Sequence, residues 1–446
     1  MKKLSKRALS VALASMMMLS IASCGGNETT DTTSNGGGTA EGGSGKTELR
    51  FTSWANTGEI KVLQRAVDAY NELQDNVTVT FESSASDTYE QKLITALSGG
   101  TAWDVFYAGD CTIIKLIQNG SIMKLNDFME TEDSYCKIED FDEGLWGAAM
   151  TDDGSVYGLT VDCNPNLLYY QPKMIEEVGA EDPQELYAAG NWTWEKFSEI
   201  NQKFVDAGKE GYLFGGDTGT TYSWIATNKG NIWTDTTYGY DDAAVEALHY
   251  IADELEAGRW FYSGLLPQGQ GEDAQFLSGL CGFTKAGRWN TPTFSDAGVE
   301  HDYIPFPTSD GSQNPAVQIA TAYCSVNKDS KNVEEAMKFA TYYCSVDGQR
   351  VRLEEQDGKP GNAVPAIKGC DDIIENASIP EHATYLLDVR SVGWAIGSPW
   401  AKDARYPGMD TELKAILEET WVDGANIDDT ITKVEEKANE LVAENS

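Results

Sequence analysis

The fold is decided by residues 47–107, which open with Thr47-Glu48-Leu49-Arg50-Phe51-Thr52-Ser53-Trp54. In this run Leu49, Phe51 and Ser53 alternate with polar neighbours, the pattern of a strand with one buried face. The next segments predict a helix, a strand, a helix and a strand, from these residues: Ile60, Leu63, Val67 and Tyr70; Val77, Val79 and Phe81; Tyr89, Leu93 and Leu97; Trp103 to Tyr107. This alternation predicts a parallel sheet covered by helices.

Polar and aromatic side chains follow two of these predicted strands. Trp54 and Asn56 come at the end of the first strand, and Tyr107 and Asp110 come at the end of the third. Ligands collect at the carboxyl ends of the strands in such sheets. We therefore expect these four residues at one edge of the sheet, in a binding site.

The N-terminus has the pattern of a bacterial lipoprotein signal. Basic residues between positions 2 and 7 precede an apolar run over 8–23, which is too short to span a bilayer, and Cys24 follows small residues. Residues 1–23 are therefore predicted to be a signal peptide, and Cys24 the lipid-bearing membrane anchor. Residues 24–46 are rich in Gly, Ser and Thr and predict a flexible linker. An ordinary secretory signal with an incidental cysteine is the alternative.

The chain is strongly acidic, with 71 Asp and Glu against 33 Lys and Arg and a formal net charge of −38. Such a surface repels phosphates, so we expect no nucleic acid partner. It also disfavours anionic ligands, although a local basic pocket could override the global field. About 400 residues remain after the signal and the linker, more than one ordinary core takes, which predicts two lobes.

The remaining cysteines and the histidines carry no metal or catalytic pattern. The seven further cysteines are odd in number and widely spaced, without C-x-x-C, so most are expected to be buried small hydrophobes, with one or two bridges left open. His249, His301 and His382 have no metal-ligand spacing, and no hydrolase or phosphate-binding motif occurs. We expect no cofactor and no metal. Glycoside hydrolysis needs only two close carboxylates, which counting does not exclude.

A series of different short motifs is spread along the chain. They are Phe51-Thr52-Ser53-Trp54; Tyr89-Glu90-Gln91-Lys92-Leu93, leading to Ser98-Gly99-Gly100-Thr101-Ala102-Trp103-Asp104-Val105; Tyr157-Gly158-Leu159-Thr160, leading to Leu168-Tyr169-Tyr170; Trp192-Thr193-Trp194-Glu195; Gly287-Arg288-Trp289; and Pro305-Phe306-Pro307. In this order and spacing the chain resembles extracellular solute-binding proteins of family 1, the maltose-binding-protein-like lipoproteins of ABC importers. Trp103, where the family usually has proline, and Gln171-Pro172-Lys173, in place of Asn-Lys-Asp, depart from the pattern in local loops.

The resemblance implies a type II periplasmic-binding-protein-like α/β fold. Each of two lobes would be a mainly parallel sheet flanked by helices, with a hinge between the lobes. We place lobe 1 at residues 47–161 plus 316–370, and lobe 2 at residues 162–315 plus 371–446.

Two further structural predictions come from the residues alone. Asp428 and Asp429 begin a C-terminal helix with an apolar face made by Ile431, Val434, Ala438 and Leu441. Burial in a core is the ordinary outcome for a tryptophan, and we expect it for Trp146, Trp192, Trp194 and Trp421.

A sugar site needs aromatic rings for the C–H faces of the sugar and polar groups for its hydroxyls. The resemblance places side chains of both kinds in the cleft loops. The candidate ligand contacts are Trp54, Asn56, Tyr107, Asp110, Asp162, Asn164, Tyr222, Trp224, Trp289, Asn290, Trp394 and Trp400.

The expected function is that of a receptor, not an enzyme. Two lobes would close around a mono- or oligosaccharide and deliver it to the permease subunits of an ABC importer, with the monomeric protein anchored by lipid to the outer face of the cell membrane. A binder of another solute on the same fold is an alternative, whether polyamine, metal or peptide. Asp110 and Asp162 beside Trp54 and Trp289 would suit a polyamine. A surface glycoside hydrolase is the other alternative.

Overall fold

Residues 47–107 form strands and helices in the predicted order. They are β1 (Thr47–Trp54), α1 (Thr57–Leu73), β2 (Val77–Ser84), α2 (Ser86–Ser98) and β3 (Val105–Ala108), with β1 parallel to both β2 and β3. The first helix begins where it does because Asn56 caps it: the Asn56 side chain accepts from the backbone N–H of Gly58 and Glu59, and the Glu59 side chain accepts from that of Asn56. The prediction for this segment is confirmed.

The computed structural model describes residues 45–151, 153–234, 236–267, 270–393 and 399–445. Cys24, the predicted signal peptide and most of the predicted linker lie outside the described residues. Within the described part, no helix is both long and apolar enough to cross a membrane.

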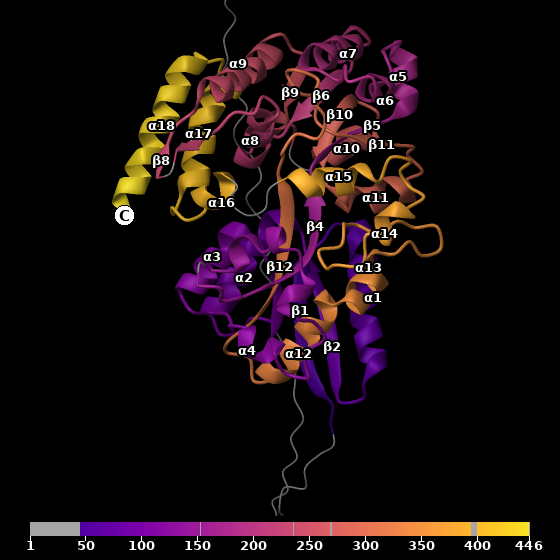
Figure 1. Cartoon of the computed structure of the whole chain (residues 1–446), viewed down its shortest axis with the longest axis vertical. Coiled ribbons are helices and arrows are strands. Elements are labelled where there is room, and N and C mark those ends of the chain that lie inside the picture. Colours follow the sequence, from indigo (N-terminus) through magenta and orange to yellow (C-terminus); the bar gives the residue numbers. More distant parts are fainter. Residues whose placement is uncertain (1–44, 152, 235, 268–269, 394–398, 446) are drawn as a thin grey trace, which may run out of the picture. The chain divides into compact units, whose positions relative to one another are not determined.

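Two five-stranded sheets organise residues 45–446 (Figure 1). The first has the order β2-β1-β3-β12-β4, with β12 at Ile319–Val326 and β4 at Leu159–Pro165. The second has the order β11-β5-β10-β6-β9, with strands at Asp302–Ile304, Leu167–Tyr170, Cys281–Ala286, Glu210–Phe214 and Trp260–Tyr262. A short hairpin pairs β7 (Trp233–Thr234) with β8 (Thr237–Tyr238).

Both sheets are mixed, and each is mainly parallel as predicted, because four of its five strands run in one direction and one runs against them. In the first sheet β12 runs antiparallel to β3 and β4, and in the second β5 runs antiparallel to β10 and β11. The reason is the route of the chain. The chain passes from β4 in the first sheet to β5 in the second, and β12 later brings it back into the first sheet, antiparallel to β4.

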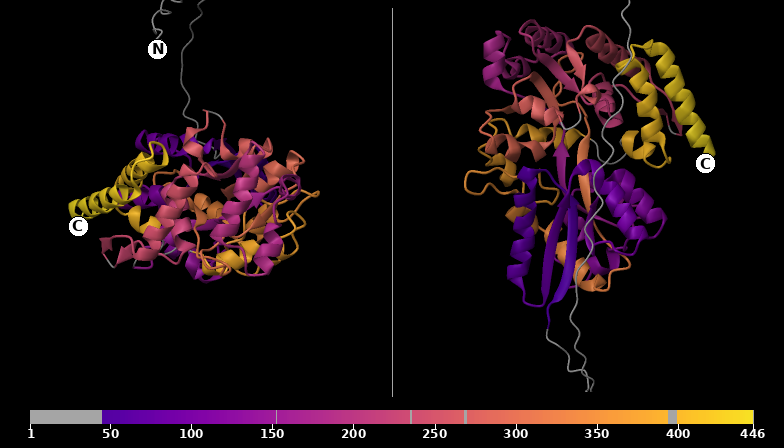
Figure 2. Two further views of the ribbon diagram at one scale, coloured as in Figure 1. Left: turned by 90° about the horizontal axis from the view of Figure 1, so that it is seen from above. Right: turned by 180° about the vertical axis from the view of Figure 1, so that it is seen from behind.

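The helices fall into two groups around the sheets (Figures 1 and 2). With the first sheet lie α1 and α2, and also α3 (Asp110–Gln118), α4 (Asn126–Met129), α12 (Val333–Cys344) and α13 (Val346–Leu353). With the second sheet lie α5 (Pro172–Val178), α6 (Pro183–Ala188), α7 (Trp194–Asp206), α8 (Thr218–Ala226), α9 (Asp242–Glu256), α10 (Glu272–Leu277), α11 (Thr291–Asp296), α16 (Pro399–Asp403), α17 (Met409–Trp421) and α18 (Ile427–Glu444). Two further helices, α14 (Asp372–Glu375) and α15 (Tyr385–Val392), lie where the chain crosses between the sheets, and α15 packs against β4.

The C-terminal helix α18 confirms its prediction. The Asn426 side chain caps it by accepting from the backbone N–H of Asp428 and Asp429, and its predicted apolar face is buried. Trp146, Trp192, Trp194 and Trp421 are buried as predicted. The seven described cysteines are free thiols, and all except Cys111 are buried.

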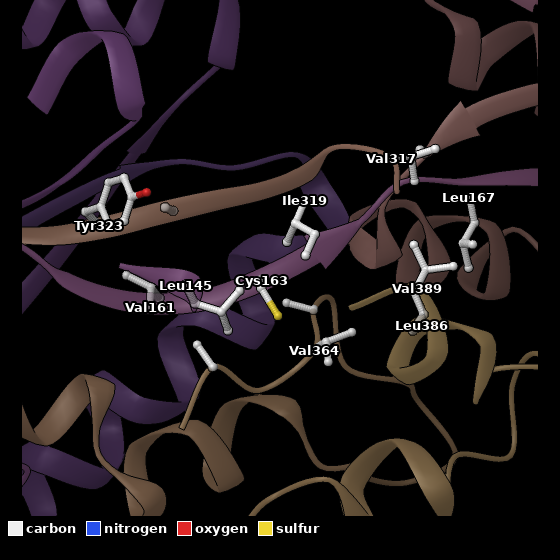
Figure 3. Close-up of a cluster of buried hydrophobic side chains, with 14 of the residues drawn as sticks. Leu145, Val161, Cys163, Leu167, Val317, Ile319, Tyr323, Val364, Leu386 and Val389 are labelled. Carbon is white, nitrogen blue, oxygen red and sulfur yellow. The ribbon is translucent and has the colours of Figure 1, made fainter. Parts of the chain in front are cut away.

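The strands that connect the two sheets are held by a shared core. Val161 and Cys163 of β4 and Ile319 of β12 lie in one cluster with Val364 and with side chains of α15 (Figure 3). Between β4 and β5 the side-chain amide of Asn166 donates to the Gln318 side-chain carbonyl at 3.1 Å. These crossings lie near the proposed boundaries between the lobes, and the lobe assignment itself stays a prediction.

Candidate ligand-binding site

A cavity of about 690 Å³ lies among elements of both sheets. Its volume is in the range of pockets for small molecules. The first sheet and its helices contribute Trp54, Asn56, Glu59, Tyr107, Asp162, Asn164 and Thr321; the second contributes Ser263, Glu272, Asp273, Lys285, Trp289 and Asn290; Asn362 also lines it.

The cavity brings many of the predicted contacts together. Those on its wall are Trp54, Asn56, Tyr107, Asp162, Asn164, Trp289 and Asn290. Residues far apart in the sequence therefore meet at one place, and the wall has the mixture of aromatic and polar groups expected of a small-molecule site.

Asp110 lies behind the wall. Thr321 lines the cavity and its hydroxyl donates to the Tyr323 hydroxyl, which in turn donates to the Asp110 carboxylate, both at 2.8 Å. Burial raises the pKa of Asp110 to about 6, against the hydrogen bond from Tyr323. In this structure Asp110 supports a lining residue through Tyr323.

Two other predicted contacts, Tyr222 and Trp224, lie apart from the cavity wall. Tyr222 and Trp224 are in α8, where they are 1% and 0% exposed and pack within the core. Trp400 belongs to α16, and Trp394 lies outside the described residues.

The two tryptophans on the wall are held by packing but remain partly exposed. The Trp54 ring meets Tyr89 and Tyr107 edge to face, with centroids 5.3 and 5.5 Å apart. The Trp289 ring lies directly against Gly287, so that a Cβ added at Gly287 would come within 2.2 Å of the ring. Fixed, partly exposed rings of this kind can stack on a flat apolar face of a ligand.

The N-terminus of α1 touches the second group of elements directly. The Asn56 side-chain amide donates to the Trp289 carbonyl oxygen at 3.4 Å, and its oxygen accepts from the Thr293 hydroxyl at 3.3 Å. A Cβ at Gly58 would lie 2.6 Å from the Thr293 hydroxyl oxygen. This junction stands at the edge of the cavity, where Asn56 and Trp289 both line it.

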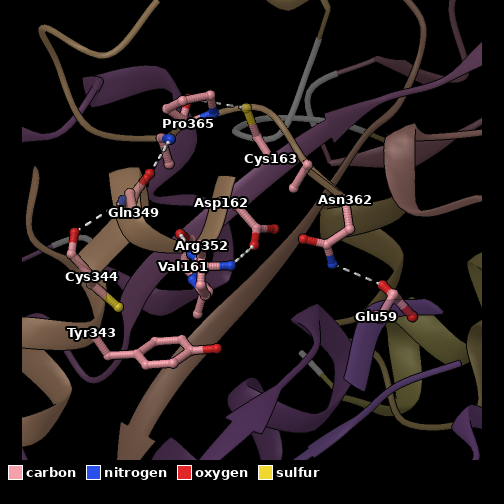
Figure 4. A network of polar contacts seen from close by, with 12 residues as sticks. Glu59, Val161, Asp162, Cys163, Tyr343, Cys344, Gln349, Arg352, Asn362 and Pro365 are labelled. Atoms are coloured by element: carbon pink, nitrogen blue, oxygen red, sulfur yellow. Dashed lines mark hydrogen bonds and ion pairs between the residues drawn. The ribbon is translucent and has the colours of Figure 1, made fainter. Parts of the chain in front are cut away.

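A buried ion pair lies on the first-sheet side (Figure 4). Arg352, which is 0% exposed, donates to the Asp162 carboxylate and to the Val161 carbonyl oxygen, each at 2.8 Å. Its guanidinium also stands 4.8 Å from the Tyr343 ring centroid. Burial raises the pKa of Asp162, and the charge of Arg352 opposes that shift.

Glu59 reaches the same side of the cavity from the first turn of α1 (Figure 4). Its carboxylate accepts from the backbone N–H of Asn56 at 2.8 Å and from the Asn362 side-chain amide at 3.1 Å. Burial raises the pKa of Glu59 to about 7, against those two hydrogen bonds.

The second-sheet side carries a further acidic group beside a lysine. The Glu272 carboxylate accepts from the Ser263 hydroxyl at 2.7 Å and from the Thr284 hydroxyl at 3.3 Å. Burial raises the pKa of Glu272, and the charge of Lys285 opposes the rise. The Lys285 ammonium also lies 3.7 Å from the Asp217 carboxylate.

Sequence reasoning missed Glu59, Glu272, Asp273 and Lys285. Among 71 acidic residues no local pattern marks Glu272 or Asp273 as lining a cavity. Only Glu59 carried a usable signal, because it follows Asn56 by three positions in a capping box, which places it at the ligand edge of the sheet.

A second cavity of about 600 Å³ lies beside Trp233 and Lys402, among α8, α16 and residues 308–316. None of its lining residues belongs to a strand of the first sheet. The described residues contain no group of His, Cys, Asp or Glu side chains arranged to hold a metal ion. The larger cavity between the two sheets is therefore the candidate site.

Two mixed α/β sheets, joined by crossing strands with an aromatic and polar cavity between them, define the class of two-lobed solute receptors. The chain belongs to the bacterial extracellular solute-binding protein family, whose model matches residues 54–350. The resemblance predicted from the motifs is confirmed. Members of this family bind solutes outside the cytoplasm.

Curated relatives are distant. The chain is 21% identical over 380 residues to the galactooligosaccharide-binding protein of Bacillus subtilis, a match covering 82% of each chain. It is 26% identical over 179 residues to a putative binding protein of Brucella abortus, which covers 37% of this chain and 41% of the relative.

Solved structures confirm the fold class. An ABC substrate-binding protein of Listeria monocytogenes in complex with cycloalternan has a TM-score of 0.76 at 19% identity, covering 90% of this chain and all of that one (100%). A binding protein associated with an ABC transporter of B. animalis subsp. lactis, in complex with β-1,6-galactobiose, has a TM-score of 0.73 at 16% identity and covers 90% of this chain and 98% of the other.

Proposed function

We propose that this protein captures a sugar or oligosaccharide in the cavity between its two sheets and delivers it to the permease of an ABC importer. The observation that carries the proposal is the wall of that cavity, where Trp54 and Trp289 offer aromatic faces from the two sides. The amides of Asn164 and Asn290 and the carboxylate of Asp162 line the same cavity and can bond sugar hydroxyls.

The relatives support the ligand class. The curated Bacillus subtilis protein is named for galactooligosaccharides, and two of the similar structures hold cycloalternan and β-1,6-galactobiose. Lobe closure would bring both aromatic walls onto one ligand and so stabilise the closed form. Permease delivery and the monomeric state belong to this proposal.

The lipid anchor is part of the same proposal. It rests on the signal-like residues 1–23 and on the small residues before Cys24. An anchored receptor would stay beside the importer on the outer face of the membrane.

A polyamine receptor is the second candidate, because acidic groups outnumber basic ones on the cavity wall. Glu59, Asp162, Glu272 and Asp273 face a single lysine, Lys285. Carboxylates beside tryptophans also suit an ammonium ligand.

A thermal-shift screen against neutral oligosaccharides and polyamines separates the two candidates. We expect a rise in melting temperature with at least one saccharide and none with spermidine or putrescine, and the bound saccharide should be recovered intact. A shift with polyamines alone would assign the protein to the second candidate. Hydrolysis of the saccharide that disappears in Glu59→Gln would instead make it a glycoside hydrolase.

A further inference from the structure

The charged groups that line the cavity are unequal in number. The lining contains four carboxylates, Glu59, Asp162, Glu272 and Asp273, and one ammonium group, that of Lys285. The charge balance of the site thus follows that of the whole chain, and no local basic pocket reverses it here.

The positive groups near this wall are already engaged. Arg352 is fully buried against Asp162, so that pair is close to neutral. Lys285 lies near Asp217 and interacts with Glu272, so its charge is shared between two carboxylates. Arg288 is buried and donates to the Ala363 carbonyl oxygen, and it does not line the cavity.

The carboxylates that remain suit hydroxyl donors. Glu272 accepts from Ser263 and Thr284, and Glu59 accepts from Asn56 and Asn362, so each is held in place by protein donors. A carboxylate has about four lone-pair sites, so each can still accept from a ligand hydroxyl. Hydrogen bonds from a neutral donor to an ionised acceptor are stronger than those between neutral groups.

We propose that Glu272 and Asp273 make the site select neutral saccharides and reject acidic ones, such as uronic acids. This inference rests on the proposed function and names its substrate class. In a uronic acid a carboxylate replaces a CH₂OH group, so the ligand loses a donor and brings a negative charge toward like charges. In a partly buried site that repulsion is poorly screened by water and salt.

The test uses calorimetry with matched pairs of disaccharides built on glucose, galactose and mannose. In each pair one member is neutral and the other carries a carboxylate in place of CH₂OH. We expect the neutral member of the best-binding pair to bind at least about tenfold tighter than its acidic partner.

Two charge variants and one control make the test specific. Glu272→Gln and Asp273→Asn should each narrow the preference for the neutral sugar severalfold, because each removes a like charge but keeps an oxygen acceptor. Asp273→Asn gives a second test if Glu272→Gln lowers the melting temperature, since the Asp273 carboxylate accepts from the adjacent backbone N–H of Ala274 and not from the hydroxyls that hold Glu272. Glu256→Gln, on the exposed end of α9, should leave the preference unchanged.

Equal or tighter binding of the acidic partner would overturn this inference and leave the proposed function standing. A preference that stays the same in both charge variants would also overturn it. Failure of every saccharide in both series to bind would instead overturn the proposed function.

Discussion

At the scale of single residues, Trp289 has the most direct proposed role. It is partly exposed on the cavity wall and its backbone carbonyl oxygen accepts from Asn56. A stacking ring contributes about 0.5–1.5 kcal/mol beyond the area it buries, so Trp289→Ala should weaken saccharide binding at least about tenfold. Calorimetry and the melting temperature are both measured on this variant.

Trp103→Ala is the matched control. Trp103 is also partly exposed, but its indole N–H donates to Glu82 and it lies outside the cavity lining. Its loss should leave affinity unchanged. If Trp289→Ala keeps full affinity and loses several degrees of melting temperature, Trp289 is a packing residue and not a ligand contact.

Asp403 gives a prediction about pH and stability. It accepts hydrogen bonds from the Tyr222 hydroxyl at 2.5 Å and the Trp233 indole at 3.0 Å, and burial raises its pKa to about 8. The folded state therefore holds a proton that the unfolded chain releases near its ordinary pKa. Stability is greatest below that ordinary value and falls by about 1.4 kcal/mol per pH unit as the pH rises toward the folded pKa.

Asp403→Asn removes this titration while keeping an acceptor for Trp233. We expect the melting temperature of the variant, relative to the native chain, to be higher at pH 8 than at pH 5. Thermal melts at both pH values measure it. Parallel pH profiles for the two proteins would show that Asp403 is ionised in the folded state.

At the scale of elements, the N-terminus of α1, capped by Asn56, contacts the second group of elements at Trp289 and Thr293. Gly58 permits this contact, since a Cβ there would lie 2.6 Å from the Thr293 hydroxyl oxygen and 3.0 Å from its backbone nitrogen. If α1 and α11 meet only when the lobes close, Gly58→Ala opposes closure. Crowding of this kind costs roughly 1–3 kcal/mol, so affinity should fall about tenfold although Gly58 does not line the cavity.

The stability of the Gly58→Ala protein should not fall, because alanine favours a helix over glycine. Gly144→Ala is the control, with nothing within 4 Å of the added carbon. Calorimetric titration of both variants with the saccharide measures the predicted loss of affinity. Unchanged affinity in Gly58→Ala would mean that this junction does not control binding.

Elements with local patterns were predictable from the sequence, and long-range pairings were not. The alternation over residues 47–107 predicted β1 to β3 and the helices between them, and α18 followed from Asp428 and Asp429 at its start and from its apolar face. β12 pairs antiparallel with β3 although the two strands are more than 200 residues apart in the sequence, as in the pair Tyr107 and Cys324. No local sequence pattern encodes such a pairing.

The same limit applies to the site. Trp54 and Tyr107 lie toward the ends of β1 and β3 and were placed from the predicted topology, whereas Asp162, within β4, was placed by the family resemblance. Glu272 and Lys285 line the cavity from α10 and β10, which pack together, so their place there depends on tertiary structure. Tyr222 and Trp224 show the opposite case, because an aromatic pattern alone does not distinguish a cleft from a core.

At the scale of the whole molecule, the proposed anchor joins the receptor to the membrane. Cys24→Ala should release the protein into the medium or leave it with its signal peptide, because acyl chains can no longer be attached. Membrane fractionation and mass spectrometry of the native and variant chains measure the outcome. A native mature chain that begins elsewhere and carries no lipid would contradict the anchor.

The central claim is that a saccharide binds in the cavity between the two sheets. A crystal structure of the protein with the best saccharide from the screen tests it most directly. We predict sugar rings in contact with Trp54 on one side and Trp289 on the other, with hydroxyls bonded to Asp162 or Glu272. A saccharide bound at the second cavity beside Trp233 and Lys402, with the cavity between the sheets empty, would contradict the account.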